Sequence, residues 1–560
     1  MTVARRDLSE ERRRRLRHRA LPALGGAVFL LLLVALIRSC GTSDEVSGAR
    51  RFAGAWERGD YAAMHAQLTE RAKRLFPRAA FEAAYRSAAA TATATAVEAG
   101  DVRDADGGAV VPLTLRTRVF GTMRGDLEVP MSGASVKWSP RLVFPALRRG
   151  EILTRRSEPP RRASILARDG GAIASGPATA RAPTTLGLGI SGAVGPPETA
   201  AGREAVYARG FPHSWPVGLG GLEAILETRV AGTPGGRLLA GPRVVASASP
   251  RAARAVRTTI DLQLESAAQI ALAGRLGGVA VLDAHTAQVR ALAGIAFSGP
   301  QPPGSTFKIV TLAAALEHRV AKTSTRFPFS SYALIDGVKL RNANDEVCGG
   351  SVAEGFVHSC NSVYAPLGVR VGAKNLVGMA ERFGWNRAPP FPRARPSTLP
   401  AAGAIESKLA LGATAIGQGK ALATPLQLAT VAQTIAGGGL QRTPSIVPGR
   451  LPRARRVIST RTAHVIRKLM VGVVARGTGV SAALGSGVVA GKTGTAELES
   501  TTGPAVDQAD RRSHTDAWFT AFAPAKRPRI VVAVMLVRAG AGGETAAPAA
   551  RTVLQAALSK

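Results

Sequence analysis

The stretch PPGSTFKIV, residues 302–310, sets Ser305 and Lys308 three positions apart at the start of an apolar run. On a helix this spacing brings two side chains onto one face. A serine hydroxyl is a poor nucleophile unless a base lies within hydrogen-bond reach, so the pair predicts a nucleophile and its base. The alternative is a solvated helix surface, because S-x-x-K occurs by chance about once in a chain of this length.

The residues that follow this pair favour the catalytic interpretation. If STFKIVTLAAALE, residues 305–317, forms a helix, that helix is apolar nearly all round and runs through a domain core. Ser305 then lies at the helix N-terminus, where backbone N–H groups and the positive end of the dipole stabilise an anion. Desolvation in such a core lowers the pKa of Lys308, which suits it to act as a base.

A second motif lies in VHSCNSVYAPLG, residues 357–368, where Ser359 and Asn361 stand on either side of Cys360. The hydroxyl is suited to relaying a proton and the amide to holding a peptide group of a substrate. The alternative for the serine is a helix cap.

A third motif, KTGT at residues 492–495, lies in an apparent strand. Because residues alternate along a strand, Lys492 and Gly494 point to one face and Thr493 and Thr495 to the other. Gly494 leaves room for the close approach of a ligand backbone, and its alternative is a turn glycine.

In this order, S-x-x-K, S-x-N and K-T-G resemble the active-site set of penicillin-binding proteins and serine β-lactamases. PPGSTFK, SCNSVYAPLG, AIGQGKALATPLQLATVAQTIAGGG, GVVARGTG and GKTGTAE together resemble class B penicillin-binding proteins, the monofunctional D,D-transpeptidases that cross-link peptidoglycan. The resemblance covers residues 257–560 and implies a transpeptidase domain there, with an antiparallel sheet covered by helices. Strands at both ends of this segment and a helical middle agree with such a fold.

The resemblance implies a role for each residue of the acyl transfer. Ser305 would attack the carbonyl between the two terminal D-alanines of a stem peptide, and Lys308 would accept the proton. Ser359 would pass a proton toward the leaving amine. An amine of a neighbouring stem peptide would then resolve the acyl-enzyme, and β-lactams would acylate the same serine.

The resemblance also implies how the substrate is held. Asn361 would hold the peptide backbone, while Lys492, Thr493 and Thr495, beside Gly494, would bind the terminal carboxylate. The backbone N–H groups of the nucleophilic serine and of Thr495 would hold the oxyanion. No metal or organic cofactor is implied.

The N-terminus predicts the compartment. The first twenty residues contain eight arginines, and residues 21–37, LPALGGAVFLLLLVALI, are seventeen uncharged residues. This length just suffices to span a bilayer, and arginine-rich flanks stay cytoplasmic. We therefore expect a basic tail at 1–20, a single-pass plasma-membrane anchor at 21–37, and an extracytoplasmic catalytic domain. The alternatives are a cleaved signal peptide and a lipid-modified Cys40, which Arg38 disfavours.

The charge fits this location. Lys and Arg number 73 against 38 Asp and Glu, a formal charge of +35. An exported chain with only 5% aromatic residues does not suit nucleic-acid binding, so we relate the charge to anionic lipid headgroups, wall polymers or arginine-rich composition. In an oxidising compartment Cys348 and Cys360 form either a disulfide or two buried thiols. Two cysteines alone do not make a zinc site.

Two further domains precede the transpeptidase segment, which makes the expected fold multidomain α+β. Residues 45–143 read as helices followed by strands, resemble the NTF2-like N-terminal module of the MecA-type subgroup, and contain no catalytic cluster. Residues 145–256 are rich in Gly, Pro, Ala and Arg and resemble the family's pedestal, or dimerisation, segment. Ala163 and Ala167 stand where the family shows Gly and Asp.

Parts of the sequence are also compatible with other functions. A β-lactamase would need a residue that activates water, and Glu406 in IESKLA superficially suits that role. A β-lactam sensor needs several membrane spans, and a non-catalytic scaffold would bind wall peptides without turnover. The absence of room for a glycosyltransferase domain disfavours a bifunctional protein, and the family suggests a membrane-embedded glycosyltransferase as partner.

Overall fold

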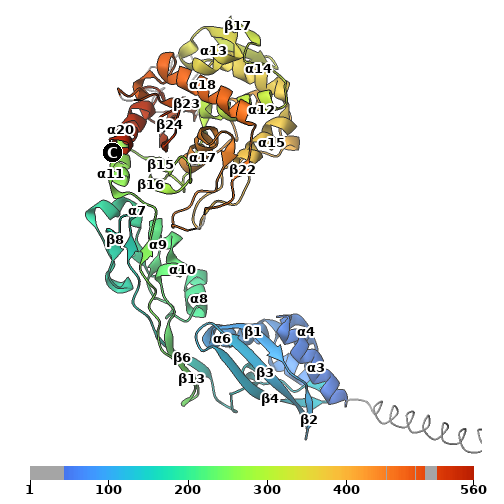
Figure 1. Ribbon diagram of the computed structural model, residues 1–560. Coiled ribbons are helices and arrows are strands. Elements are labelled where there is room, and N and C mark those ends of the chain that lie inside the picture. Colours follow the sequence, from blue (N-terminus) through green and yellow to red (C-terminus); the bar gives the residue numbers. More distant parts are fainter. Residues whose placement is uncertain (1–42, 450, 486, 499–513, 560) are drawn as a thin grey trace, which may run out of the picture. The chain divides into compact units, whose positions relative to one another are not determined.

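The computed structural model describes residues 43–449, 451–485, 487–498 and 514–559 (Figure 1). The predicted tail and anchor, residues 1–37, lie outside the described residues. Within the described ranges, no helix has the length and apolar character needed to cross a membrane.

The chain forms two compact units. Of the described residues, the first unit comprises 43–160, Glu198–Ser214 and Thr233–Arg251, and the second comprises Arg161–Pro197, Trp215–Gly232 and the described residues from Ala252 onward. The segment 145–256, expected to form one pedestal, therefore contributes to both units.

The first unit begins with helices and continues with an antiparallel sheet, as the sequence predicts. Val111, Leu113 and Leu115 alternate with less buried residues, so one face of the sheet packs into the core of the unit. Strand order is β1-β3-β4-β5, with β2 paired to β3. The elements are α3 (Asp44–Glu57), α4 (Tyr61–Ala66), α5 (Glu70–Leu75), α6 (Arg78–Ala92), β1 (Ala94–Ala99), β2 (Arg103–Ala105), β3 (Gly108–Thr117), β4 (Thr122–Ser132) and β5 (Ser135–Val136).

The same unit contains a three-stranded antiparallel sheet of β6 (Leu153–Glu158), β12 (Gly235–Ala240) and β13 (Arg243–Ala248), and helix α8 (Ala200–Ala208). Arg155 of β6 donates hydrogen bonds to backbone carbonyls at the end of α6 and of α8. The guanidinium of Arg155 therefore connects β6 to the ends of α6 and α8, and its partners there are backbone carbonyls rather than carboxylates.

The second unit begins with a small sheet of strand order β14-β7-β8-β9. Beside it a buried carboxylate holds two arginines: Glu223 accepts from Arg162 and Arg181, each at 2.6 Å. The strands are β7 (Ile165–Leu166), β8 (Ala172–Ser175), β9 (Ala182–Pro183) and β14 (Val256–Arg257).

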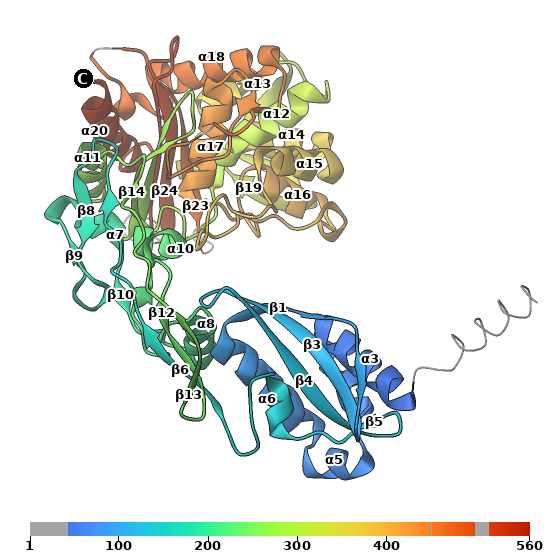
Figure 2. The same ribbon diagram turned by 60° about the horizontal axis from the view of Figure 1, so that its bottom comes forward.

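The larger part of the second unit is built on a five-stranded antiparallel sheet of order β16-β15-β25-β24-β23. Figure 2 shows α11 and α20 on one side of these strands and α17 and α18 on the other. This arrangement confirms the predicted sheet covered by helices. The strands and helices are β15 (Gly277–Asp283), β16 (Val289–Gly294), β23 (Ala490–Glu497), β24 (Thr515–Ala523), β25 (Ile530–Leu536), α11 (Leu262–Leu272), α17 (Pro425–Ala436), α18 (Thr460–Arg476) and α20 (Ala546–Leu558).

The middle of the segment is helical and carries short hairpins. These elements pack on the face of the sheet opposite α11 and α20, where the largest hydrophobic core lies. They are η5 (Gly304–Phe307), α12 (Lys308–Glu317), β17 (Arg326–Ser330), β18 (Tyr332–Ile335), β19 (Val338–Arg341), β20 (Cys348–Ser351), α13 (Val352–Val357), α14 (Asn361–Val371), α15 (Ala373–Phe383), α16 (Lys408–Ala415), β21 (Leu440–Gln441) and β22 (Arg455–Arg456).

Candidate active site

Ser305 lies in the 3₁₀ turn η5, and Lys308 begins helix α12. The predicted helix therefore starts as a tighter turn, in which residues i and i+3 still stand on the same side. Residues 309–315 of α12 are fully buried, which confirms that this helix passes through the domain core. The buried, apolar helix α12 thus holds in place the turn that carries Ser305.

Close backbone contacts hold this turn. Gly304 has a φ of +52°, its N–H donates to the Gly417 carbonyl at 2.9 Å, and a Cβ atom on it would lie 2.5 Å from the carbonyl oxygen of Thr495. Thr306 adds a hydrogen bond from its hydroxyl to the Pro303 carbonyl at 2.7 Å. Glycine is required at 304 because only it combines this φ with so close an approach.

Lys308 is fully buried, and its amine is directed at the second motif. Its Nζ lies 2.5 Å from the Ser359 carbonyl oxygen, 2.7 Å from Asn361 Oδ1 and 3.4 Å from Ser359 Oγ. Burial, together with the charge of Lys492, lowers the pKa of Lys308 well below its usual value. Burial therefore favours the neutral form of this amine.

The Ser305 side chain is partly exposed, and its hydroxyl makes no hydrogen bond to any described residue. The direct contact expected between the serine and Lys308 is thus not formed in this structure. Catalytic hydrogen bonds are often long in the free form of an enzyme and tighten when substrate binds.

Ser359 lies between α13 and α14 and has a φ of +61°. A residue other than glycine in this left-handed region persists only where its surroundings hold it, and such conformations gather at functional sites. Here the Lys308 amine holds its carbonyl and the Lys492 amine donates to its hydroxyl at 2.8 Å. Ser359 therefore stands between two lysine amines.

Lys492 lies on β23, at one edge of the five-stranded sheet. Its side chain is fully buried, and this burial lowers its pKa to about 7. Besides the Ser359 hydroxyl, its amine contacts the Thr493 carbonyl at 3.1 Å. The charge of Lys492 can therefore change near neutral pH.

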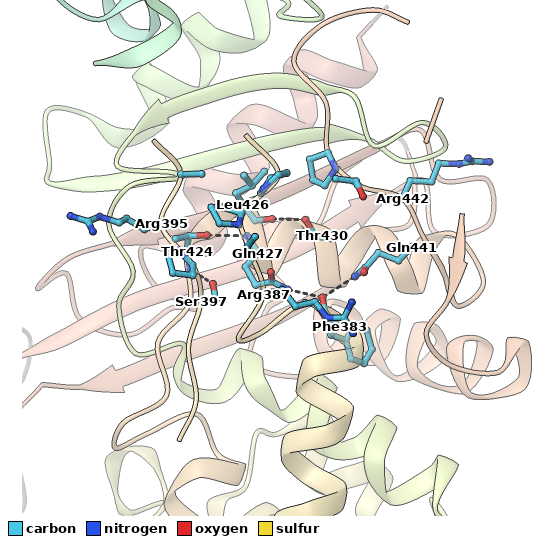
Figure 3. Close-up of a pocket in the computed structure, with 18 of the residues that line it drawn as sticks. Phe383, Arg387, Arg395, Ser397, Thr424, Leu426, Gln427, Thr430, Gln441 and Arg442 are labelled. Atoms are coloured by element: carbon cyan, nitrogen blue, oxygen red, sulfur yellow. Dashed lines mark hydrogen bonds between the residues drawn. The ribbon is translucent and has the colours of Figure 1, made fainter. Parts of the chain in front are cut away.

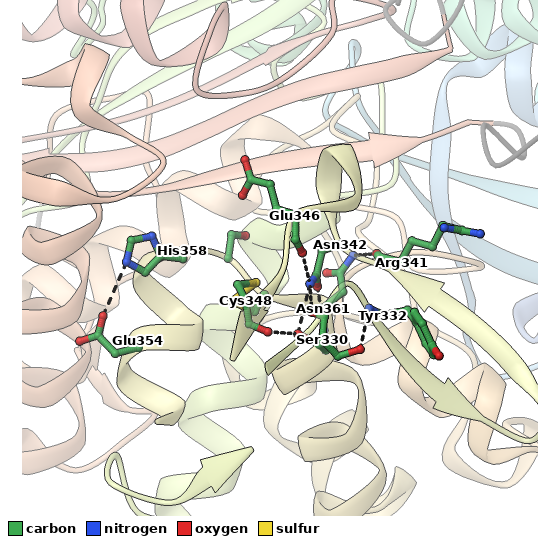
Figure 4. Close-up of a disulfide and its surroundings, with 12 residues drawn as sticks. Ser330, Tyr332, Arg341, Asn342, Glu346, Cys348, Glu354, His358 and Asn361 are labelled. Carbon is green, nitrogen blue, oxygen red and sulfur yellow. Dashed lines mark hydrogen bonds and ion pairs between the residues drawn. A yellow bond between two sulfur atoms is a disulfide. The ribbon is translucent and has the colours of Figure 1, made fainter. Parts of the chain in front are cut away.

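The second motif is tied down on its other side as well. Asn361 Nδ2 donates to the Arg341 carbonyl at 2.7 Å, and a disulfide joins Cys348 to Cys360 with a Cα–Cα distance of 5.9 Å (Figure 4). Of the two states left open by the sequence, this structure holds the bridged one. The bridge connects β20 to the residue that precedes α14, so it restrains the loop that carries Ser359.

The KTGT residues alternate as predicted, but the reason for the glycine differs. A Cβ on Gly494 would lie 2.8 Å from the Pro303 carbonyl oxygen and 2.9 Å from Thr306 Cγ2. The space beside Gly494 is thus filled by the turn that carries the serine, not left for a ligand backbone. Thr493 contacts the hydroxyl of Thr478 at 2.5 Å. Thr495 accepts from the N–H of Gly542 at 3.3 Å.

Sequence reasoning missed three residues that support the site. Gly417 receives the Gly304 N–H, Thr478 contacts Thr493, and the ring of Tyr364 lies 5.8 Å from the Lys308 amine. All three lie within the quoted stretches AIGQGKALATPLQ, GVVARGTG and SCNSVYAPLG, and these stretches were the available signal.

Glu406, the residue that superficially suited water activation, is exposed and, among described residues, makes no hydrogen bond to the site. No group of acidic, His or Cys side chains suited to a metal occurs in the described part of the chain.

Comparisons with known families agree with this arrangement. Residues 277–555 match the penicillin binding protein transpeptidase domain, and residues 46–151 match the NTF2-like N-terminal transpeptidase domain.

Among curated proteins, the chain is 38% identical over 289 residues to peptidoglycan D,D-transpeptidase PbpA of Mycobacterium tuberculosis, covering 47% of this chain and 56% of PbpA. It is 31% identical over 283 residues to stage V sporulation protein D of Bacillus subtilis, covering 46% and 42% of the two chains. The chain thus spans about half the length of the curated relatives it matches.

Solved structures are similar over a larger share of this chain. The D,D-transpeptidase domain of a peptidoglycan glycosyltransferase from Eggerthella lenta is 26% identical with a TM-score of 0.58, covering 71% of this chain and 98% of that one. Penicillin-binding protein A from M. tuberculosis, solved as its penicillin G acyl-enzyme complex, is 26% identical with a TM-score of 0.57, covering 71% and 100%.

The contact of Gly494 with the serine turn can be tested by Gly494→Ala. Because the added methyl group would meet a backbone oxygen, we expect the free energy of unfolding to fall by about 1–3 kcal/mol in urea titrations. Gly378→Ala is the control, since a Cβ there meets no atom within 4 Å and alanine suits its position in α15. Equal stability of the two variants would contradict the proposed contact.

Proposed function

We propose that this chain, which carries a penicillin-binding-protein transpeptidase domain and an NTF2-like N-terminal domain and is homologous to class B penicillin-binding proteins, is a serine D,D-transpeptidase of peptidoglycan. The observation that carries the proposal is the burial of two amines, those of Lys308 and Lys492, against Ser359, beside the turn that presents Ser305. Such a site can accept, relay and return a proton without a carboxylate.

In the first half of the reaction Ser305 Oγ attacks the carbonyl carbon between the two terminal D-alanines of a stem peptide. The neutral amine of Lys308 takes the hydroxyl proton, and the N–H groups of Ser305 and Thr495 hold the oxyanion. The C–N bond then breaks, and Ser359 passes a proton to the departing D-alanine. An ester between the serine and the penultimate D-alanine remains.

In the second half an amine of a neighbouring stem peptide attacks this ester. The amine loses a proton, Ser305 regains one, and the new amide is the cross-link. The acyl-enzyme ester and the amide product contain the same carbonyl group, that of the penultimate D-alanine. The same proton relay can therefore serve both halves of the reaction. A β-lactam would enter at the first half, through opening of its cyclic amide by Ser305.

Substrate binding is proposed to use the edge of the sheet. Strand β23 is the last in its sheet among the described residues, and an extended peptide can pair with such an edge. Protonated Lys492, with Thr493 and Thr495, would bind the terminal carboxylate, and Asn361 would hold the peptide backbone. Gly494 would contribute indirectly, because it lets the serine turn approach the strand.

The location and partner remain predictions. Residues 21–37 would anchor the chain in the plasma membrane with the catalytic domain outside, and a membrane-embedded glycosyltransferase would supply the glycan strands to be cross-linked. Co-purification of the full chain from membranes tests this partner, and its repeated absence would count against it.

The nucleophile is tested by labelling the full chain with fluorescent penicillin and following its intact mass over hours. We expect a stable adduct on the wild type and none on Ser305→Ala, because only the serine hydroxyl can form the ester. Ser324→Ala, at an exposed position, is the control and should label like the wild type.

The other outcomes discriminate between the alternative functions. No adduct with accumulation of hydrolysed drug would indicate a β-lactamase, and would require a water-activating residue other than the exposed Glu406. No adduct with intact drug would indicate a scaffold that binds wall peptides without turnover.

The pH dependence of penicillin acylation tests the role of Lys492. Because its pKa is about 7, Lys492 is charged below that pH and neutral above it. We expect the second-order acylation constant to fall as the pH rises through about 7, since the charge that attracts the drug's carboxylate is lost. In Lys492→Arg the guanidinium stays charged, so the fall in the acylation constant (the descending limb of its pH profile) should disappear, however low the constant itself becomes. A descending limb at the same pH in both proteins would assign it to another group.

A further inference from the structure

A cavity of about 440 Å³ opens in the transpeptidase segment (Figure 3). Its walls come from the end of α15, the loop that follows it, the first turns of α17 and the residues of β21 and β22. None of Ser305, Lys308, Ser359 or Lys492 lines it. The size is that of a pocket for a small molecule.

Four arginines line this cavity, and no aspartate or glutamate does. Arg387 and Arg395 come from the loop after α15, while Arg442 and Arg455 come from the segment of β21 and β22. Figure 3 shows Arg387 among the central lining residues, with Arg395 and Arg442 toward opposite ends. The cavity therefore has a positive wall.

The contacts of these arginines leave their charges uncompensated. Within the described residues, the guanidinium groups of Arg387 and Arg395 make no hydrogen bond or ion pair. Arg442 donates to the Pro452 carbonyl at 2.6 Å, and Arg455 donates to Gln441 Oε1 at 2.8 Å. These partners are neutral oxygens, so they fix two side chains in place without balancing their charge.

These cavity arginines differ from two other pairs of arginines in the described chain, each of which shares a carboxylate. Arg162 and Arg181 share Glu223, and Arg78 and Arg86 share Glu82. At the cavity, burial and the nearby charges of Arg387 and Arg382 instead lower the pKa of Arg455. Like charges held together in a partly buried site lower stability unless an anion joins them.

The remaining lining is largely apolar and includes Leu426, Ala394 and four prolines. We propose that this cavity binds a small ligand that joins a phosphate or carboxylate group to an apolar body, with the oxyanion between Arg387 and Arg455. Guanidinium groups bind both oxyanions through paired N–H donors, and the apolar wall holds the rest of the ligand. The positive end of α17 adds attraction, although Thr424 Oγ1 already accepts the N–H of Gln427.

The proposal is tested on the full chain in detergent by calorimetric titration with inorganic phosphate and, separately, with succinate, at constant ionic strength. We expect saturable binding of at least one of them, weakened about tenfold or more in Arg387→Gln, because a charge-assisted hydrogen bond to the oxyanion is lost. Arg395→Gln, nearer one end of the cavity, should weaken it only about two- to threefold. Arg461→Gln, an exposed arginine outside the cavity, is the charge-matched control and should leave it unchanged.

The outcomes separate the possible ligands from a general charge effect. Binding of phosphate alone assigns the site to a phosphate-bearing ligand, binding of succinate alone to a carboxylate, and binding of both to oxyanions of either kind. Absence of saturable binding, an unchanged affinity in Arg387→Gln, or equal weakening in all three variants overturns the proposal. Penicillin labelling of Arg387→Gln, which should match the wild type, shows that the variant is folded.

Discussion

Two lysine amines buried against one serine are the constraint on which the candidate site depends. Within the described residues neither Lys308 nor Lys492 has a carboxylate partner, and both are fully buried. Burying a charged amine without a counter-charge is costly, so burial lowers the pKa of both amines, that of Lys492 to about 7. The apolar helix α12 and the sheet strand β23 hold them in place, and Ser359 adopts a left-handed conformation between them.

Close packing of backbone on backbone connects these two lysines to Ser305. Gly304, Gly417 and Gly494 let the serine turn, the loop before α17 and the edge of the sheet approach within distances that no side chain would allow. These close contacts hold the turn against the strand, and among the described residues no direct hydrogen bond joins Ser305 to Lys492. Positioning on rigid elements is what acyl transfer requires, because a misplacement of about 1 Å lowers the rate about a hundredfold.

Charge is arranged differently in different parts of the chain. Beside the small sheet of the second unit, buried arginines share a buried glutamate, and on the surface several arginines pair with single carboxylates. The cavity beside α15 and α17 lacks such a partner, and at the candidate site burial lowers the pKa of both lysines. An excess of basic residues thus serves structure in one place and, by our proposals, proton transfer in another and anion binding in a third.

The sequence by itself determined the identity and order of the three motifs, the apolar character of the helix behind Ser305, the α+β pattern of the first unit and the sheet at both ends of the transpeptidase segment. These features follow from local periodicity and from residue types at short spacing. Only the tertiary structure decided that Lys308 is directed at Ser359 and Asn361, that Gly494 faces the serine turn, that Cys348 and Cys360 are joined, and that four arginines surround one cavity. Each of these is a contact between side chains or backbone from different elements, and the distance between such elements depends on how the whole core packs.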